Sequence, residues 1–167
     1  MTDSTSCRVT ANLRLRAVTL DDLPIVMAIE TDPKTNKHRP GGPPAPEDVK
    51  QHLRAFVQTW DEHGVGYWIA EHQGEAVGLA GLRPLGFRGR PCWNVYYRFS
   101  PTVWRRGFAT EAAREALAVA RTREPLLPVV ARTRPSNQPA VRVAERAGLK
   151  RRPDLDADGF LVLCDGW

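Results

Sequence analysis

The segment from residue 93 to residue 112 constrains this chain most, because it reads as a strand, a basic glycine turn and the start of a helix. Its first part is rich in aromatic residues, which favour a strand. Arg105, Arg106 and Gly107 form the turn, and small residues then recur at helical spacing. The first N–H groups of a helix lack intrahelical partners, and the helix dipole adds about half a positive charge there. The segment therefore predicts an anion site that suits a pyrophosphate.

The rest of the chain alternates between strand and helix patterns in an order that predicts a mixed sheet. Three consecutive strands before the turn favour an antiparallel meander, whereas each of the two later helices follows a strand, as in crossover units. The fold class is therefore mixed α/β (α+β), with a mostly antiparallel central sheet and helices on both faces. We expect strands at about 13–18, 67–71, 76–82, 92–99, 127–133, 149–153 and 160–164, and helices at about 20–31, 47–62, 108–122 and 138–147.

We expect a single domain over residues 1–167, with a flexible segment at 1–12 and a glycine-rich connection at 86–89. Residues 32–46 hold five prolines, and either a lid or a surface loop fits such a long connection. Residues 154–165 match the spacing of a calcium loop, but the chain leaves no exit helix after them. We therefore interpret 156–159 as a hairpin turn and expect no metal site.

The composition of the chain limits which classes of ligand and partner we expect it to bind. The formal net charge is +5, and 20 of the 24 basic residues are Arg, which suits a polyanionic ligand. No basic run is interleaved with aromatic residues, so we expect no nucleic-acid partner. No apolar run is long enough for a membrane span and no signal sequence is recognisable, so we expect a cytoplasmic protein with no membrane contact. Cys7, Cys92 and Cys164 show no paired spacing and are expected to be reduced.

Three local patterns resemble those of a known family. Residues 100–112 read SPTVWRRGFATEA and are similar to the pattern S-P-x-x-W-G-[KR]-G-[YF]-A-T-E-A, except that Arg105 stands where Gly is usual. Residues 137–149 and 64–68 are similar to two further segments of the same family. The chain thus resembles, over about residues 13–164, the GNAT superfamily of acetyl-CoA-dependent N-acetyltransferases, and within it the RimJ/RimL-type branch.

The resemblance implies acetyl-CoA as the cofactor, bound in a crevice where strands 92–99 and 127–133 splay apart. The amides of about 105–110 would hold the pyrophosphate, and the backbone of Phe99 would pair with the pantetheine and polarise the thioester. Asn137 would line the same crevice. The implied cofactor-binding residues are Phe99, Arg105, Arg106, Gly107, Phe108, Ala109, Thr110 and Asn137.

The chain departs from the family pattern at the expected acid and base. Transfer needs a neutral amine, so a base or a water must take its proton. Ala144 stands where the family often has Tyr, Ala140 where the branch often has Ser, and Asn94 where Glu is common. The candidate catalytic residues are Asn94, Glu71 and Tyr97, with His38 and His72 as further candidates for the base.

Two functions remain open, and a basic nucleic-acid-binding protein is a third alternative that the composition disfavours. The first is an N-acetyltransferase that acetylates a primary amine, on a protein N-terminus or a small molecule, by direct attack in a ternary complex. The acceptor would enter beneath the first two helices, with loop 32–46 over it. The second is a catalytically silent acyl-CoA-binding sensor or regulatory module, which the losses at Asn94, Ala140 and Ala144 favour. The sequence leaves a homodimer open.

Overall fold

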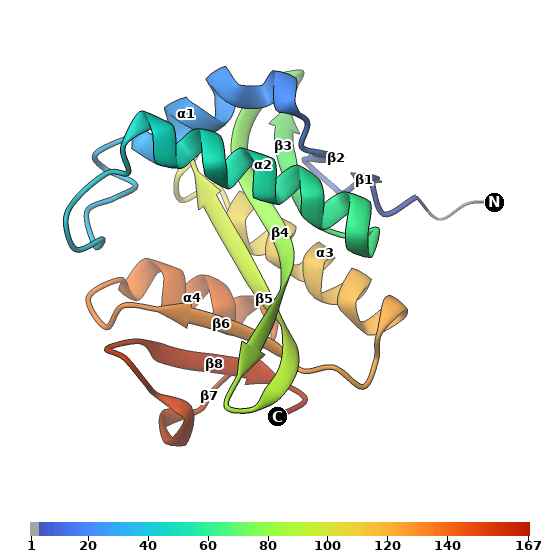
Figure 1. Cartoon of the computed structure of the whole chain (residues 1–167), viewed down its shortest axis with the longest axis vertical. Coiled ribbons are helices and arrows are strands. Elements are labelled where there is room, and N and C mark those ends of the chain that lie inside the picture. The colour runs from blue at the N-terminus through green and yellow to red at the C-terminus, as the bar shows by residue number, and fades with distance from the viewer. Residues whose placement is uncertain (1–3) are drawn as a thin grey trace.

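The computed structural model describes residues 4–167, which build one eight-stranded sheet with the strand order β1-β2-β3-β4-β5-β6-β8-β7 (Figure 1). Every neighbouring pair is antiparallel except β5 and β6, which run parallel. The predicted mixed, mostly antiparallel sheet is therefore confirmed. The strands are β1 (Cys7–Val9), β2 (Arg14–Ala17), β3 (Tyr67–His72), β4 (Glu75–Phe87), β5 (Arg90–Phe99), β6 (Val129–Thr133), β7 (Lys150–Arg151) and β8 (Leu161–Asp165).

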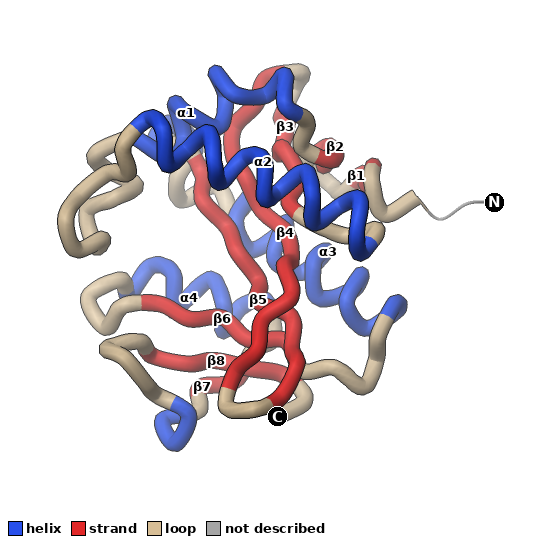
Figure 2. The backbone as a smooth tube through the Cα atoms, in the orientation of Figure 1, coloured by secondary structure: helices blue, strands red, loops and turns tan. Residues whose placement is uncertain are grey.

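Helices cover both faces of the sheet, as predicted (Figure 2). On the face of the sheet that α3 and α4 cover, small helix residues pack against the strands. Ala112, Ala113 and Ala116 of α3 are fully buried there. A second apolar cluster joins α1 and α2 to the opposite face through Val26, Val49 and other buried residues. The helices are α1 (Leu23–Thr31), α2 (Pro46–His63), α3 (Phe108–Arg123) and α4 (Gln138–Ala147), with short 3₁₀ turns at Leu20–Asp22, Pro101–Val103 and Pro153–Leu155.

The structure differs from the prediction at the N-terminus. Cys7–Val9 forms a strand, whereas flexible chain was expected over 1–12; residues 1–3 lie outside the described residues. The strand pairs with β2, and Glu111 of α3 holds the turn that follows it by accepting hydrogen bonds from the N–H and the side-chain amide of Asn12 (2.7 and 2.9 Å). These tertiary contacts order a segment that has no hydrophobic period of its own.

The predicted connection at 86–89 is also shorter than expected. β4 continues to Phe87, opposite Arg90 of β5, and only Arg88 and Gly89 form the turn. Both have a positive φ (50° and 74°), as a two-residue hairpin turn requires. The continuous pairing with β5 outweighs the low strand propensity of Pro84 and Gly86.

Residues 32–45 form an ordered strap rather than a regular element. Asn36 ties the strap to the end of α1, because its side-chain amide donates to the carbonyls of Glu30 (2.7 Å) and Asp32 (2.8 Å). At its far side, Nδ1 of His38 lies 3.1 Å from the hydroxyl of Ser136, in the loop between β6 and α4. Figure 1 shows the strap descending from α1 and α2 towards that loop. No helix in the described part of the chain is long and apolar enough to cross a membrane.

Candidate functional site

β5 and β6 part early, and this leaves one edge of β5 without a neighbouring strand. Their pairing is confined to Trp93 opposite Val129 and Asn94 opposite Val130. The N–H of Trp93 donates to the β6 side, to Pro128 (2.8 Å), whereas the N–H of Ser100 donates to the β4 side (2.9 Å). Because successive residues of a strand direct their backbone groups to opposite edges, those of Tyr97 and Phe99 face the β6 side. Among the described residues no strand pairs with β5 there.

The turn at the start of α3 lies directly after this open edge. Arg105 and Gly107 both have left-handed backbone, with φ of 66° and 82°. The N–H of Glu111 is the first that donates to a carbonyl of this turn, that of Gly107 (3.0 Å), so the amides of 108–110 precede the helical ladder. Alternating left-handed and ordinary residues direct neighbouring N–H groups to one side and form a cradle for an anion.

A side-chain cluster fixes Arg106 at the edge of this turn. The Arg106 guanidinium donates to Nε2 of His72 (3.1 Å), and Nδ1 of His72 donates to the carbonyl of Asn12 (2.8 Å). Phe108 packs against both, with its ring centroid 4.7 Å from the His72 ring and 4.7 Å from the guanidinium carbon. Both nitrogens of His72 are thus occupied, so His72 positions Arg106 and has no free lone pair to act as a base.

Phe99 is held from two directions at the end of β5. Its carbonyl accepts a hydrogen bond from the indole N–H of Trp104 (2.8 Å), which leaves its N–H as the backbone group available on the open edge. Its ring covers Gly78 of β4: a Cβ on that glycine would lie 2.4 Å from the ring. Trp104 and Gly78 therefore fix the strand end that precedes the turn at residues 105–107, which we call the anion turn after its predicted ligand.

Tyr97 spans the gap between β5 and α4. Its hydroxyl donates to the carbonyl of Ala140 (2.7 Å), in the first turn of α4, where Asn137 caps the helix by accepting from the N–H of Ala140 (3.3 Å). Burial raises the pKa of Tyr97, so its hydroxyl stays protonated. The hydroxyl of Tyr97 thus lies one helical turn from Ala144, the position at which the family often has its own tyrosine. The predicted caps of α4, Asn137 and Gly148, are confirmed.

The structure does not bring the three candidate catalytic residues together. Asn94 is buried on β5 with its side chain on the face opposite Tyr97, because successive strand residues alternate. Glu71 lies on β3, where its two oxygens accept from Arg14 (2.9 Å) and Arg16 (2.7 Å). Burial of Glu71 favours the protonated form, but these hydrogen bonds outweigh it and lower its pKa. A carboxylate held in this way is a poor proton acceptor.

The sequence analysis did not predict a polar cluster formed by Glu30, Tyr96 and Arg98. Glu30 of α1 is only 4% exposed and faces Tyr96 and Arg98, which alternate with Tyr97 along β5. The Tyr96 hydroxyl donates to Glu30 (2.5 Å), and Arg98 donates to the side-chain oxygen of Asn36 in the strap (3.0 Å). Its signal in the sequence is that Glu30 falls on the apolar stripe of the first helix, one turn after buried residues.

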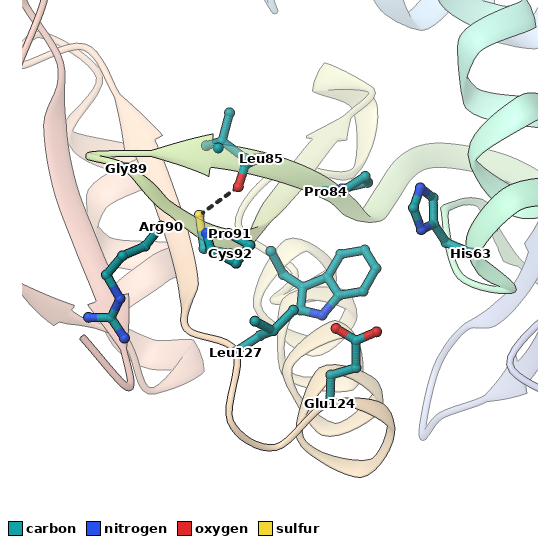
Figure 3. A pocket seen from close by; sticks show the side chains of 11 residues that line it. His63, Pro84, Leu85, Gly89, Arg90, Pro91, Cys92, Glu124 and Leu127 are labelled. Carbon is teal, nitrogen blue, oxygen red and sulfur yellow. Dashed lines mark hydrogen bonds between the residues drawn. The ribbon is translucent and has the colours of Figure 1, made fainter.

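Two cavities lie along β5, one at its far end and one beside the residues that follow Phe99. The larger, about 540 Å³, is at the opposite end of β5, between the β4–β5 hairpin and the C-terminal end of α3 (Figure 3). Cys92 lines it and donates to the carbonyl of Leu85 (3.3 Å), and burial raises the pKa of this thiol to about 11. A smaller cavity of about 400 Å³ lies between α1 and the residues Ser100 and Pro101 that open the anion turn.

The calcium-like segment folds as the predicted hairpin turn. Asp158 and Gly159 have φ of 54° and 75°, and Ala157 and Phe160 exchange backbone hydrogen bonds (3.3 and 2.9 Å). Asp156 is directed to Arg151 and to the N–H of Val162 (2.9 Å) rather than to a common centre. Within residues 4–167, no group of three or more metal-ligating side chains is found.

Comparison with known families assigns the chain to one of them. The family model described as "Acetyltransferase (GNAT) domain" matches residues 12–150, which is most of the chain. It includes the open edge of β5, the anion turn and α4. The predicted fold, a mixed sheet with helices on both faces, is that of the matching structures.

Individual relatives are more distant. "Uncharacterized protein YkkB" of Bacillus subtilis is 31% identical over 60% of this chain and 62% of its own length. "FsC-acetyl coenzyme A-N(2)-transacetylase" of Aspergillus fumigatus is 28% identical over 84% of this chain and 63% of its own length. The matches therefore span less than two thirds of these curated relatives. A solved acetyltransferase structure from Agrobacterium tumefaciens has a TM-score of 0.82 at 22% identity, covering 95% of this chain and 93% of that one.

Proposed function

Since the chain belongs to the acetyltransferase (GNAT) family, we propose that it transfers the acetyl group of acetyl-CoA to a primary amine. The observation that carries this proposal is the left-handed turn at Arg105 and Gly107, placed directly after the unpaired edge of β5. A Cβ on Gly107 would meet no atom within 4 Å, so the space in front of the turn is open to a ligand. When bound, acetyl-CoA supplies an activated acetyl group as a thioester.

The residues of the turn and of β5 suit two parts of such a ligand, its pyrophosphate and its amide-bearing arm. The amides of residues 105–110, with the Thr110 hydroxyl, would hold the pyrophosphate, and Arg105 and Arg106 would add positive charge. The free N–H of Phe99 would receive the amide-bearing arm. Asn137, at the start of α4, would line the other side of the opening.

Catalysis would proceed by direct attack of the amine in a ternary complex, with positioning supplying much of the rate. Tyr97 is the group best placed to protonate the leaving thiolate, because its protonated hydroxyl lies beside α4 at Ala140. It would take the role of the tyrosine that Ala144 replaces. Asn94, which cannot act as a base, would at most hold a water.

Within the family we propose the RimJ/RimL-type branch, because residues 100–112 resemble the pattern of that branch at every position except Arg105. An acceptor of this branch is a protein N-terminus, and a small-molecule amine is the other acceptor class that fits. The name of the fungal relative, an acetyl coenzyme A transacetylase, supports the same donor. We place this reaction in the cytoplasm, and the proposal does not require a homodimer.

The direct test is calorimetric titration of acetyl-CoA into the parent and into Gly107→Glu. The substitution places bulk and negative charge at the open turn, so micromolar binding should be lost. Gly89→Glu is the matched control, because Gly89 also has left-handed backbone (φ 74°) and open space around it, but lies in the β4–β5 turn. If the parent itself does not bind acetyl-CoA, the proposed function is rejected.

A silent acyl-CoA-binding module is the second candidate, favoured by the absence of the usual side chains at Asn94, Ala140 and Ala144. It predicts acetyl-CoA binding without turnover. Release of free CoA in the presence of any primary amine, measured with a thiol reagent, would reject this candidate.

A further inference from the structure

Two arginines at the end of β6 pack against one aromatic ring. The guanidinium carbon of Arg132 lies 4.7 Å from the centroid of the Phe160 ring, and that of Arg134 lies 3.9 Å from it. Arg132 also lies over Phe87, at the end of β4, at 5.5 Å. The faces of these rings attract the cations and hold their planes. Two like charges at one ring repel each other, and an anion beside them would relieve that repulsion.

Arg132 has no polar partner in the protein. Its Nε is enclosed and makes no hydrogen bond. Its two Nη groups make no hydrogen bond or ion pair with any of residues 4–167 either, but they are not enclosed, so they reach the surface. An arginine that only stabilised the fold would be expected to use these donors, as Arg151 does with Asp156. The donors of Arg132 are therefore available to a ligand.

The acidic residues of the neighbouring hairpin do not neutralise this charge. Asp156 is held by Arg151 and by the N–H of Val162 (2.9 Å). Asp158 is exposed and offers Arg134 only its backbone carbonyl (3.3 Å), and within the described chain its carboxylate forms no ion pair. An anionic ligand would therefore meet positive charge here.

Arg132 lies on the face of the sheet opposite α4. It pairs with Val162 of β8, which belongs to the apolar cluster of Val130 and Phe87, whereas Ala131 belongs to the cluster of α3 and α4. β6 leaves β5 after Val130, so Arg132 is on the diverging part of β6, beside the open edge of β5. With α4 flanking the donor arm on one face, the amine has to approach from the face on which Arg132 lies.

Three loops meet on that side of the molecule. The strap contacts the β6–α4 loop through His38 and Ser136 (3.1 Å), and Arg134 in the same loop donates to the carbonyls of Asp158 (3.3 Å) and Gly159 (3.4 Å). Figure 1 shows the strap, this loop and the loop before β8 at one side. The β6–α4 loop also ends at Asn137, so the arginines and the proposed donor crevice are close neighbours.

We propose that Arg132 is a specificity residue of the acceptor site and that the acceptor is an amine that carries a carboxylate. This inference rests on the proposed acetyl transfer. The Nη groups of Arg132 receive the carboxylate, with Arg134 as a second positive charge and Phe160 as the ring that orients both. A guanidinium suits this role, because its planar fork of N–H groups matches two carboxylate oxygens. A free amino acid and a peptide with an acidic residue near its N-terminus both supply this chemistry.

The first experiment measures CoA release with two matched pairs of acceptors. The peptide pair is Ser-Asp-Asp and Ser-Asn-Asn, which share the reacting amine and their shape; the small-molecule pair is γ-aminobutyrate and n-butylamine. In the pair that the protein accepts, KM for the acidic member should be lower by about 10-fold or more, the worth of one charged hydrogen bond. The pair that shows the preference identifies the source of the carboxylate.

Substitution of Arg132 separates recognition from folding. Arg132→Gln should abolish the preference, with kcat and acetyl-CoA affinity unchanged. Arg132→Glu should reverse it, so that Ser-Lys-Lys becomes a better acceptor than Ser-Asp-Asp, which loss of packing alone would not produce. Arg134→Gln should raise KM less, because its Nη1 already donates to two carbonyls.

The matched control is Arg54→Gln, which makes the same change in net charge at an exposed position of α2 and should keep the parental preference. Added salt should raise KM for the acidic acceptor and leave that of the neutral one unchanged, because ions screen the charge pair. Melting temperatures identify any variant that fails to fold.

A second readout requires no turnover. Calorimetric titration of the acidic acceptors into protein saturated with CoA should detect binding that the neutral partners lack and that Arg132→Gln loses. Equal binding and equal KM for the acidic and neutral members of both pairs would overturn the inference, as would a parental preference in Arg132→Gln. Failure of the parent to bind acetyl-CoA rejects the proposed function instead, and that titration contains no amine.

Discussion

Arg105 and Gly107 share a left-handed backbone, with φ of 66° and 82°, but only the glycine adopts it without steric cost. For a residue with a Cβ this conformation costs about 1–2 kcal/mol. Arg105 stands where the family pattern has glycine, so the anion turn carries local strain together with an additional positive charge. The strain and the charge are separable by substitution.

Arg105→Gly should stabilise the fold by about 1 kcal/mol, which corresponds to a rise in Tm of about 2–4 °C for a chain of this size. The same change should weaken acetyl-CoA binding, because a cation beside the pyrophosphate is lost, and should reduce the salt dependence of binding. Thermal melts and calorimetry at two salt concentrations measure the two effects. Arg106→Gly is the control: Arg106 lacks a positive φ, so its loss should weaken binding with no gain in Tm. An equal rise in Tm for both variants would contradict the strain argument.

Gly78→Ala should destabilise the protein by about 1–3 kcal/mol, the usual cost of overpacking a core. The new Cβ would lie 2.4 Å from the ring of Phe99, so the ring or strand end must move. Because Phe99 precedes the anion turn, acetyl-CoA binding should weaken as well. Denaturant titration and calorimetry test both effects.

The matched control for Gly78→Ala is Gly86→Ala, on the same strand. A Cβ at Gly86 would meet no atom within 4 Å, so that variant should keep parental stability and affinity. Equal losses in the two variants would show that strand propensity, not the contact with Phe99, governs the effect.

The free energy of unfolding should fall on acidification through Glu71 and Asp22. Both carboxyls are partly buried, which favours the protonated form, but the hydrogen bonds from Arg16 outweigh this and lower both pKa values below their usual range. A group with a depressed folded pKa contributes its stability fully above its unfolded pKa, about 4, and loses it as the pH falls through the folded value. Denaturant titrations between pH 7 and pH 3 should therefore show stability declining below about pH 5.

Glu71→Gln tests this assignment. The variant should be less stable than the parent at pH 7, and the difference should shrink towards pH 3, where the parent's carboxylate is protonated as well. A stability difference that is the same at both ends of this range would show that Glu71 acts through packing and not through its charge.

The local signals in the sequence were reliable where a short segment decides its own structure. The turn at residues 105–107, the cap at Asn137, the left-handed Gly148 and the hairpin at 156–159 all depend on residue types within a few positions. β1 and the far half of β4 were missed because neighbouring strands and side chains, not their own propensities, stabilise them.

In the candidate site, too, some features could be predicted from the sequence and others only from the tertiary structure. The sequence by itself determined the fold class and the placement of a basic glycine turn after an aromatic strand, because the order of these residues along the chain is enough to predict both. Only the tertiary structure decided which side chains are free to react. It engages Glu71 with Arg14 and Arg16, occupies both nitrogens of His72, and brings Glu30 of α1 against the Tyr96 hydroxyl. Such pairings join residues far apart in the chain, and the free energy that sets them arises from burial and long-range hydrogen bonds that no local pattern encodes.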